Sequence, residues 1–238
     1  MLTSPFRTVQ TIGPGEAASA VQPAGRNRLV RGESLAVMRA LPDAAFDVIY
    51  LDPPFFTQQT RQLQQGDDGP AYDDTWEGGL HGYLSWLEER LARARALLQP
   101  HGALFLHLDW HAVHYAKVLL DRLFGRACFQ NEFIWYYSGG GASRRRFARK
   151  HDTLLYYTMD PHTWKFYVDR IRTPHKWTDG QRRADGSARD YAKGKLPDDV
   201  WEFHALLPWA EENVGYPTQK PEALLERLLL ATTDPGDV

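Results

Sequence analysis

Four consecutive residues, Asp52-Pro53-Pro54-Phe55, carry the strongest chemical signal in the sequence. They directly follow an apolar run, Phe46 to Leu51, whose valine, isoleucine and tyrosine content predicts a buried strand. The two prolines end strand pairing, because proline has no backbone N–H to donate. Ligands of open α/β sheets bind beyond the carboxyl ends of the strands, so this placement favours a functional site over a plain turn.

The chemistry that suits this motif is the activation of an amine on a nucleobase. The exocyclic amine of adenine or cytosine is a poor nucleophile, because its lone pair is delocalised into the ring. The Asp52 carboxylate can accept a hydrogen bond from one N–H group of such an amine, and the rigid backbone carbonyl of Pro53 can accept a hydrogen bond from the other. Phe55 would then stack on a base rotated out of the duplex, since the reacting atom is inaccessible inside the base stack.

Further motifs follow in a fixed order along the chain. They are Arg31 to Ser34, Leu106 to Trp110, Lys150 to Asp152 and Pro217-Thr218-Gln219-Lys220-Pro221. Taken together with Asp52 to Phe55, they resemble the permuted DNA adenine-N6 or cytosine-N4 methyltransferases, in which the catalytic motif precedes the cofactor motif. The resemblance covers about residues 29–238. It implies a Rossmann-like methyltransferase sheet, S-adenosylmethionine as the methyl donor and double-stranded DNA as the substrate.

The resemblance also implies roles for single residues. Asp52, Pro53, Pro54 and Phe55 match the catalytic motif, with Asp52 also beside the cofactor. Thr218, Gln219 and Lys220 match the segment that contacts the methionine end of the cofactor, although a simple helix start explains them as well. Glu33 stands where an acidic residue near the cofactor is usual, more often Asp. An Asp at position 52 favours adenine-N6 over cytosine-N4 as the acceptor.

The chain departs from the family pattern after the last predicted helix. Similar enzymes continue there into a strand and a glycine-rich loop that wraps the cofactor, whereas this sequence ends at Val238. We therefore expect an incomplete sheet and weak or no cofactor binding by these 238 residues alone, and tight stoichiometric binding in a calorimetric titration would contradict that.

A catalytically inactive DNA-binding remnant is the alternative function. The target sequence, the oligomeric state and any restriction or specificity subunit stay open.

Basic residues gather in one part of the chain. Residues 141–195 hold 14 Lys and Arg against 6 Asp and Glu, although the whole chain has a net charge of −2. Aromatic residues such as Phe147 and Trp164 lie among them, a mixture that suits phosphate neutralisation and base stacking. We expect DNA contacts from Arg144, Arg145, Arg146, Arg149 and Lys150, with a solvated loop as the alternative.

A metal-dependent nuclease or hydrolase is the main alternative from another class. His107, Asp109, His111 and His114 supply four potential ligands within eight positions. His107 and Asp109 share one face of a predicted strand, whereas His111 and His114 fall on the helix that follows. This spacing favours cap and surface histidines, so we expect no metal site.

The elements that must position these residues alternate between strands and helices. We predict strands at 29–31, 46–51 and 103–108, and helices at 34–41, 82–98 and from the N-cap Asp109 to Phe124. Residues 58–76 are predicted to form a long polar loop. Two strands at 132–137 and 153–158 follow each other directly, which predicts an antiparallel hairpin at the edge of an otherwise parallel sheet. A last helix is predicted from Pro221.

The domain organisation follows from these elements. We expect a flexible arm over residues 1–27, a catalytic core over 28–159, an inserted target-recognition region over 160–212 and a return to the core over 213–238. The single cysteine, Cys128, excludes an internal disulfide and favours a reducing compartment, with the cytoplasm as the expected location. The sequence has no apolar stretch long enough to predict a membrane span.

Overall fold

The structure is a computed structural model of the 238-residue chain. It describes residues 8–12, 29–62, 70–137, 144–174, 194–207, 209–216 and 218–238. In this part of the chain, no helix combines the length and the apolar character needed to cross a membrane.

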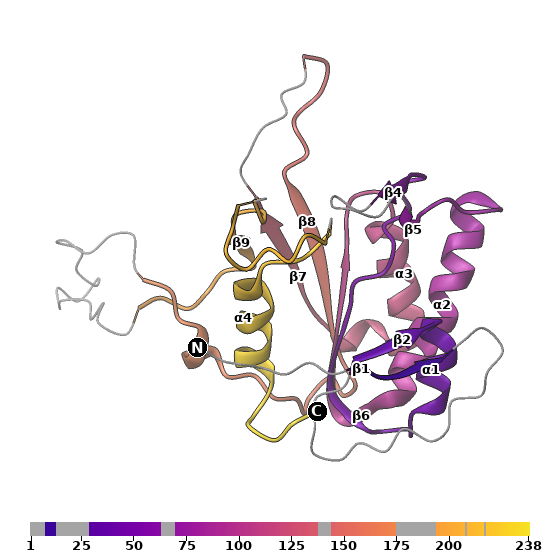
Figure 1. Ribbon diagram of the computed structural model, residues 1–238. Coiled ribbons are helices and arrows are strands. Elements are labelled where there is room, and N and C mark those ends of the chain that lie inside the picture. The colour runs from indigo at the N-terminus through magenta and orange to yellow at the C-terminus, as the bar shows by residue number, and fades with distance from the viewer. Residues whose placement is uncertain are drawn as a thin grey trace.

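A five-stranded sheet forms the centre of the fold, in the order β3-β6-β8-β7-β9 (Figure 1). The strands are β3 (Phe46–Leu51), β6 (Leu98–Leu108), β7 (Phe129–Tyr136), β8 (His151–Thr158) and β9 (Val200–Glu202). β3 pairs parallel with β6, and β9 pairs parallel with β7. β8 is antiparallel to both of its neighbours, so four of the five strands run in one direction. The predicted β7–β8 hairpin is present, but its predicted position at the sheet edge was wrong, because the short β9 pairs with β7 and forms that edge.

The remaining strands that the structure describes form two small, two-stranded sheets. β1 (Thr8–Ile12) pairs parallel with β2 (Leu29–Gly32), and β1 lies within the segment that the sequence predicts as a flexible arm. β4 (Thr60–Gln62) and β5 (Pro70–Asp73) pair antiparallel inside the region predicted as one long loop.

Helices cover both faces of the central sheet (Figure 1). They are α1 (Ser34–Ala40), α2 (Gly79–Leu97), α3 (Val113–Phe124) and α4 (Glu222–Thr232), with short 3-10 turns η1 (Arg126–Cys128) and η2 (Val168–Ile171). α2 and α3 pack on one face and α4 on the other. The helices agree with the predicted ranges within a few residues.

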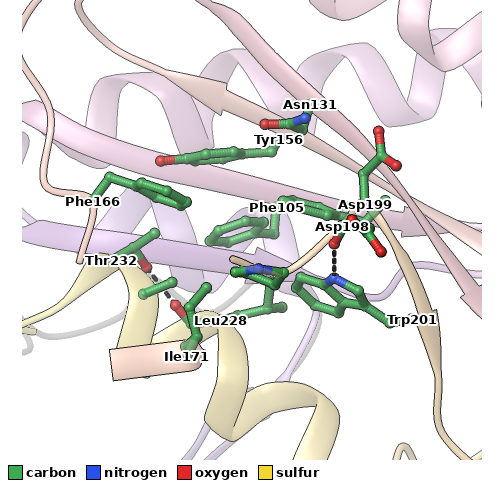
Figure 2. A pocket seen from close by; sticks show the side chains of 13 residues that line it. Phe105, Asn131, Tyr156, Phe166, Ile171, Asp198, Asp199, Trp201, Leu228 and Thr232 are labelled. Atoms are coloured by element: carbon green, nitrogen blue, oxygen red, sulfur yellow. Dashed lines mark hydrogen bonds between the residues drawn. The ribbon is translucent and has the colours of Figure 1, made fainter. Parts of the chain in front are cut away.

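The α4 face is built from large aromatic side chains. Phe105 of β6 stacks on Tyr156 of β8 with ring centroids 4.6 Å apart, and Leu228 of α4 packs against this layer. Figure 2 shows the small cavity of about 70 Å³ that remains between these side chains and Trp201 of β9. β9 therefore closes the sheet edge on the α4 side.

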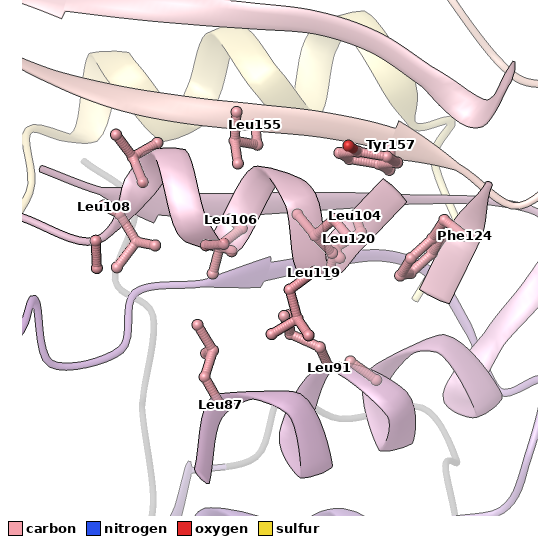
Figure 3. Packing of buried hydrophobic residues seen from close by; sticks show 14 of the residues in the cluster. Leu87, Leu91, Leu104, Leu106, Leu108, Leu119, Leu120, Phe124, Leu155 and Tyr157 are labelled. Atoms are coloured by element: carbon pink, nitrogen blue, oxygen red, sulfur yellow. The ribbon is translucent and has the colours of Figure 1, made fainter. Parts of the chain in front are cut away.

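The α2 and α3 face is aliphatic. Leu87 and Leu91 lie one turn apart on α2 and meet Leu104 and Leu106 of β6, as Figure 3 shows. Since successive residues of a strand point to opposite faces, β6 sends Phe105 toward α4 and its leucines toward α2 and α3. This two-sided burial fixes the ends of β3 and β6, where the chemistry was predicted.

Candidate active site at the carboxyl edge of the sheet

Four elements deliver polar side chains to one edge of the sheet. Asp52 follows β3, Asp109 follows β6, and Tyr137 follows β7. Because β8 runs in the opposite direction, its beginning lies at the same edge and brings Asp152 there. The carboxyl ends of the parallel strands and the start of β8 therefore meet at the edge where open α/β folds bind their ligands.

A cavity of about 520 Å³ opens at this edge. The residues that line it are Asp52, Pro53, Pro54, Phe55, Thr57, Asp109, Trp135, Tyr137, Asp152, Ala205, Tyr216, Thr218, Gln219 and Lys220. The cavity thus brings together the two motifs that the sequence singled out, although Lys220 follows Phe55 by 165 positions in the chain.

Asp52 faces this cavity and is paired with a lysine. Lys220 Nζ lies 2.7 Å from Asp52 Oδ2, with 29% of the Asp52 side chain and 11% of the Lys220 side chain exposed. The same ammonium group lies 5.1 Å from the centroid of the Phe55 ring. The carboxylate is thus held by one charge and remains open to the cavity.

The backbone behind Asp52 is held by buried groups. The Tyr83 hydroxyl donates to the Pro54 carbonyl at 2.8 Å. Asp74, which is completely buried, accepts the backbone N–H groups of Phe56 at 3.0 Å and Thr57 at 2.6 Å. Phe56 has a φ of 63°, a conformation that costs energy for a bulky residue and persists only where the surroundings enforce it.

A buried histidine connects Asp52 to the other side of the cavity. Nδ1 of His107 lies 2.6 Å from the Tyr50 hydroxyl and 3.9 Å from Asp52 Oδ1. Burial, together with the charges of Asp52 and Asp152, raises the pKa of Tyr50 well above its ordinary value, so this hydroxyl keeps its proton beside Nδ1. Nε2 of the same ring faces Asp152 Oδ2 at 3.3 Å.

Asp152 also accepts a hydrogen bond from Tyr137, whose hydroxyl lies 3.1 Å from Oδ1. Burial and the neighbouring Asp152 carboxylate raise the pKa of Tyr137, which keeps it a donor. The cavity thus holds a second carboxylate, which a hydrogen bond from Tyr137 orients.

The segment before α4 forms the opposite wall. The Gln219 side chain donates to the Glu212 carbonyl at 2.6 Å and accepts the Val214 N–H at 2.8 Å. The carbonyl of Thr218 accepts from Lys220 Nζ at 3.0 Å. Gln219 therefore shapes the loop, and Lys220 reaches across to Asp52.

Glu33 lies elsewhere. Its carboxylate caps α1 through the N–H groups of Leu35 at 3.1 Å and Ala36 at 2.8 Å, and it pairs with Arg90. Partial burial opposes ionisation, but these hydrogen bonds and the Arg90 charge outweigh it and lower the pKa of Glu33. Glu33 does not line the cavity, so its contact with a cofactor stays a prediction.

The predicted DNA-contact residues lie on the segment that leads into β8. Arg144, Arg145 and Arg146 are exposed, and Lys150 is half-buried. The Arg149 guanidinium lies 3.4 Å from the centroid of the Trp110 ring, which places the chain next to the end of β6. Figure 1 shows residues 144–150 projecting beyond the body of the fold. Residues 175–193, which hold further basic residues, lie outside the described residues.

Comparison with known proteins assigns the chain to a protein family. The family profile described as a DNA methylase matches residues 46–238. The chain belongs to this DNA methylase family. It is 30% identical over 211 residues to the type II methyltransferase M.HpaI of Haemophilus parainfluenzae, and the match covers 89% of this chain and 61% of that protein. It is 26% identical to the DNA adenine methyltransferase YhdJ of Escherichia coli K12, over 88% of this chain and 68% of that protein.

Solved structures of methyltransferases share the fold. The PvuII DNA methyltransferase, named as cytosine-N4-specific, superimposes with a TM-score of 0.56 at 15% identity, over 87% of this chain and 70% of that one. This likeness confirms the predicted α/β class with a mostly parallel central sheet. The chain spans 61% of M.HpaI and 58% of the type II methyltransferase M.BglII of Bacillus subtilis.

The four residues of the nuclease alternative do not converge in this DNA methylase-family chain. The Asp109 carboxylate accepts from the backbone N–H of His111 and lies 2.8 Å from its ring Nδ1, while His107 is directed to Tyr50 and Asp152. No group of three or more potential ligands forms among the described residues. The prediction of Asp109 as the N-cap of α3 was wrong, because a turn separates it from the true N-cap, Ala112.

Several cavity residues had no role in the sequence analysis. Trp135, Tyr137 and Tyr216 line the cavity, and the structure gives Asp152 a cavity position beyond its place in a motif. The alternation of Trp135 and Tyr137 at the end of a predicted strand was the available signal for two of them. Tyr216 lies in a region without periodicity, where the sequence offered no signal.

Proposed function

We propose that this chain transfers a methyl group from S-adenosylmethionine to the exocyclic amine of a base in double-stranded DNA, with adenine-N6 favoured over cytosine-N4. The observation that carries the proposal is the placement of Asp52, which faces the cavity, follows the β3 strand and pairs with Lys220 from the second motif. Membership of the DNA methylase family supports the same reaction class.

Asp52 and Pro53 act on the target amine in this proposal. The Asp52 carboxylate accepts a hydrogen bond from one N–H group of the amine, and the Pro53 carbonyl accepts one from the other N–H group. These two hydrogen bonds concentrate the lone pair on the nitrogen. The Pro54 carbonyl is already engaged by Tyr83, so it is a support and not an acceptor for the base. Phe55 offers a ring face for stacking in the same cavity.

The residues around the cavity fit the charges of the proposed cofactor. S-adenosylmethionine supplies a methyl group on a positively charged sulfur and carries an amino acid end. The carboxylates of Asp52, Asp109 and Asp152 suit its positive groups, and Lys220 suits its carboxylate. The cavity volume of about 520 Å³ lies within the range of ~300–1,000 Å³ typical of small-molecule sites.

The preference for adenine rests on residue 52. Asp at this position resembles adenine enzymes more than cytosine ones, and the name of YhdJ assigns that relative to adenine. The basic residues 144–150 are proposed to contact DNA phosphates, which would place the duplex over the cavity mouth. A restriction partner in the cell is part of the same proposal, since M.HpaI is a type II methyltransferase.

The direct test is to express the chain in a bacterial host without adenine or cytosine methylation and to analyse its DNA nucleosides by mass spectrometry. These 238 residues alone are expected to bind the cofactor poorly, so the glycine-rich cofactor loop of the family is supplied in trans. We then expect N6-methyladenine with the wild-type chain and none with Asp52→Ala. N4-methylcytosine in place of N6-methyladenine would show that the acceptor base is cytosine, while the reaction would still be methyl transfer to an exocyclic amine. The absence of both methylated nucleosides would contradict the proposed function of this chain. Sequencing of the methylated DNA then gives the target site.

A further inference from the structure

Phe147 has an exposure that protein folding does not explain. Its side chain is 98% exposed, the highest value among the large apolar side chains that the structure describes. It stands between Arg146 and Arg149 on the segment that projects beyond the fold (Figure 1). An exposed ring flanked by cations suits a partner whose surface is both apolar and anionic.

The base of this segment is fixed next to the cavity. The Lys150 carbonyl accepts the backbone N–H of Tyr137 at 3.0 Å, and Tyr137 lines the cavity. Arg149 stacks on Trp110, whose ring in turn lies 3.7 Å from the His111 ring. Two separate contacts therefore fix residues 149 and 150 and leave Phe147 directed away from the fold.

The distance from Phe147 to the cavity is limited by the chain itself. Asp152, which lines the cavity, lies only five positions further along the chain, and an extended chain advances at most about 3.6 Å per residue. Phe147 therefore lies within about 18 Å of the cavity wall, a distance of a few base steps along a duplex. A duplex positioned over the cavity would therefore bring its neighbouring base steps into the range of this ring.

We propose that Phe147 inserts between stacked base pairs next to the target base, while Arg144, Arg146 and Arg149 contact the flanking phosphates. The partner is double-stranded DNA, whose base stack is apolar and whose backbone is anionic. Apolar side chains that enter a duplex in this way unstack a base step and bend the helix. The inserted ring would hold open the duplex that the target base leaves. This inference rests on the proposed function, because it assumes DNA as the substrate.

The first experiment measures duplex distortion without any need for methyl transfer. Relaxed closed circular plasmid is incubated with saturating protein and a topoisomerase, and the change in linking number per bound protein is measured. We expect unwinding by the wild-type chain, a reduction of at least fivefold with Phe147→Ala, and retention of more than half with Phe147→Leu. Plasmid affinity should change by less than threefold. Tyr115→Ala, which removes an exposed ring from α3, is the matched control and should unwind like wild type.

Equal unwinding by wild type and Phe147→Ala, or no unwinding by wild type, would overturn the inference. The inference would also be overturned if the lower plasmid affinity of Phe147→Ala accounted for all of its lost unwinding. Phe147 would then contribute to DNA binding without distorting the duplex.

A second experiment separates this inference from the proposed function. Methyl transfer is measured on a duplex with the mapped target site, and on the same duplex with the target base mispaired. We expect Phe147→Ala to be at least tenfold slower than wild type on the paired duplex and within twofold on the mispaired one. An equal loss on both would overturn the inference. A wild-type chain that unwinds plasmid but methylates neither duplex would contradict the proposed function and support the insertion.

Discussion

The two walls of the cavity are built in different ways. The carboxylate wall, residues 52–57, is held from behind by Tyr83 and by Asp74, which is completely buried. The lysine wall, residues 218–220, is held by Gln219, whose partners Glu212 and Val214 belong to a loop with exposed residues. The ion pair between Asp52 and Lys220 connects the two walls.

Under the proposed function, the two walls have different tasks. An acceptor for a target amine must be fixed before the base arrives, since misplacement by about 1 Å is costly in catalysis. The buried hydrogen bonds of Asp74 supply that rigidity, even at the positive φ of Phe56. The lysine wall has fewer buried supports, which suits a segment that must admit a cofactor and release it.

The largest expected effect is the loss of Asp52 itself. Asp52→Ala removes the hydrogen-bond acceptor at the end of β3, and we expect the methyl-transfer rate to fall about 10²–10³-fold, the range for removing one preorganised hydrogen-bond partner of the reacting group. DNA affinity should stay within about twofold, because the change leaves the basic segment intact. Single-turnover transfer of labelled methyl groups measures the first quantity and filter binding the second. Turnover near the wild-type rate would remove Asp52 from the mechanism.

The next effect tests the support of each wall. Asp74→Ala leaves the N–H groups of Phe56 and Thr57 without their buried acceptor, and we expect a loss of about 2–4 kcal/mol in the free energy of unfolding. Gln219→Ala, the matched change on the lysine wall, should cost about 1 kcal/mol, because its surroundings are partly exposed. Urea denaturation of both variants measures the difference. Equal losses would show that the two walls are equally fixed.

A smaller effect is expected from the basic segment, which belongs to neither wall. Replacing Arg144, Arg145 and Arg146 by Ala should weaken binding to all DNA sequences alike. It should also reduce the salt slope of log K by about 0.9 for each phosphate that the variant no longer neutralises. Titrations at several salt concentrations measure this slope. A change in target preference at constant overall affinity would exclude phosphate binding as the role of these residues.

The smallest effect concerns the link between the walls. Lys220→Met removes the partner of Asp52 while keeping much of the side-chain volume. We expect the KM for S-adenosylmethionine to rise roughly tenfold, because the proposed charge-assisted hydrogen bond from Lys220 to the cofactor carboxylate is lost. Stability should change by less than about 1 kcal/mol, because Asp52 is partly exposed. Steady-state kinetics at saturating DNA provide the comparison. An unchanged KM would assign Lys220 to the positioning of Asp52 alone.

The sequence predicted one wall better than the other. The apolar run before Asp52 defined β3 with its correct ends, because strand burial and proline both leave local signals. Asp74 was missed, since its partners Phe56 and Thr57 are 17 to 18 residues away and the region between them is polar. Such a contact depends on tertiary structure, which composition and periodicity do not encode.

Residues brought together by strand register were equally difficult to predict. The sequence predicted the β7–β8 hairpin, but the contact of Tyr137 with Asp152 depends on its register. The Asp109 cap failed for a related reason: the chain makes a turn after β6 before α3 begins, and the carboxylate binds His111 inside that turn. Strand ends were predictable, whereas the side chains that meet beyond them were not.

The most direct measurement is a crystal structure of the chain with a duplex that contains its mapped target site and with S-adenosylhomocysteine. The account predicts an extruded base in the cavity at the carboxyl edge of the sheet. Its exocyclic nitrogen should lie about 3 Å from an Asp52 carboxylate oxygen, within hydrogen-bond distance. A target base that stays stacked in the duplex, or that enters a different part of the protein with Asp52 still bound only to Lys220, would contradict it.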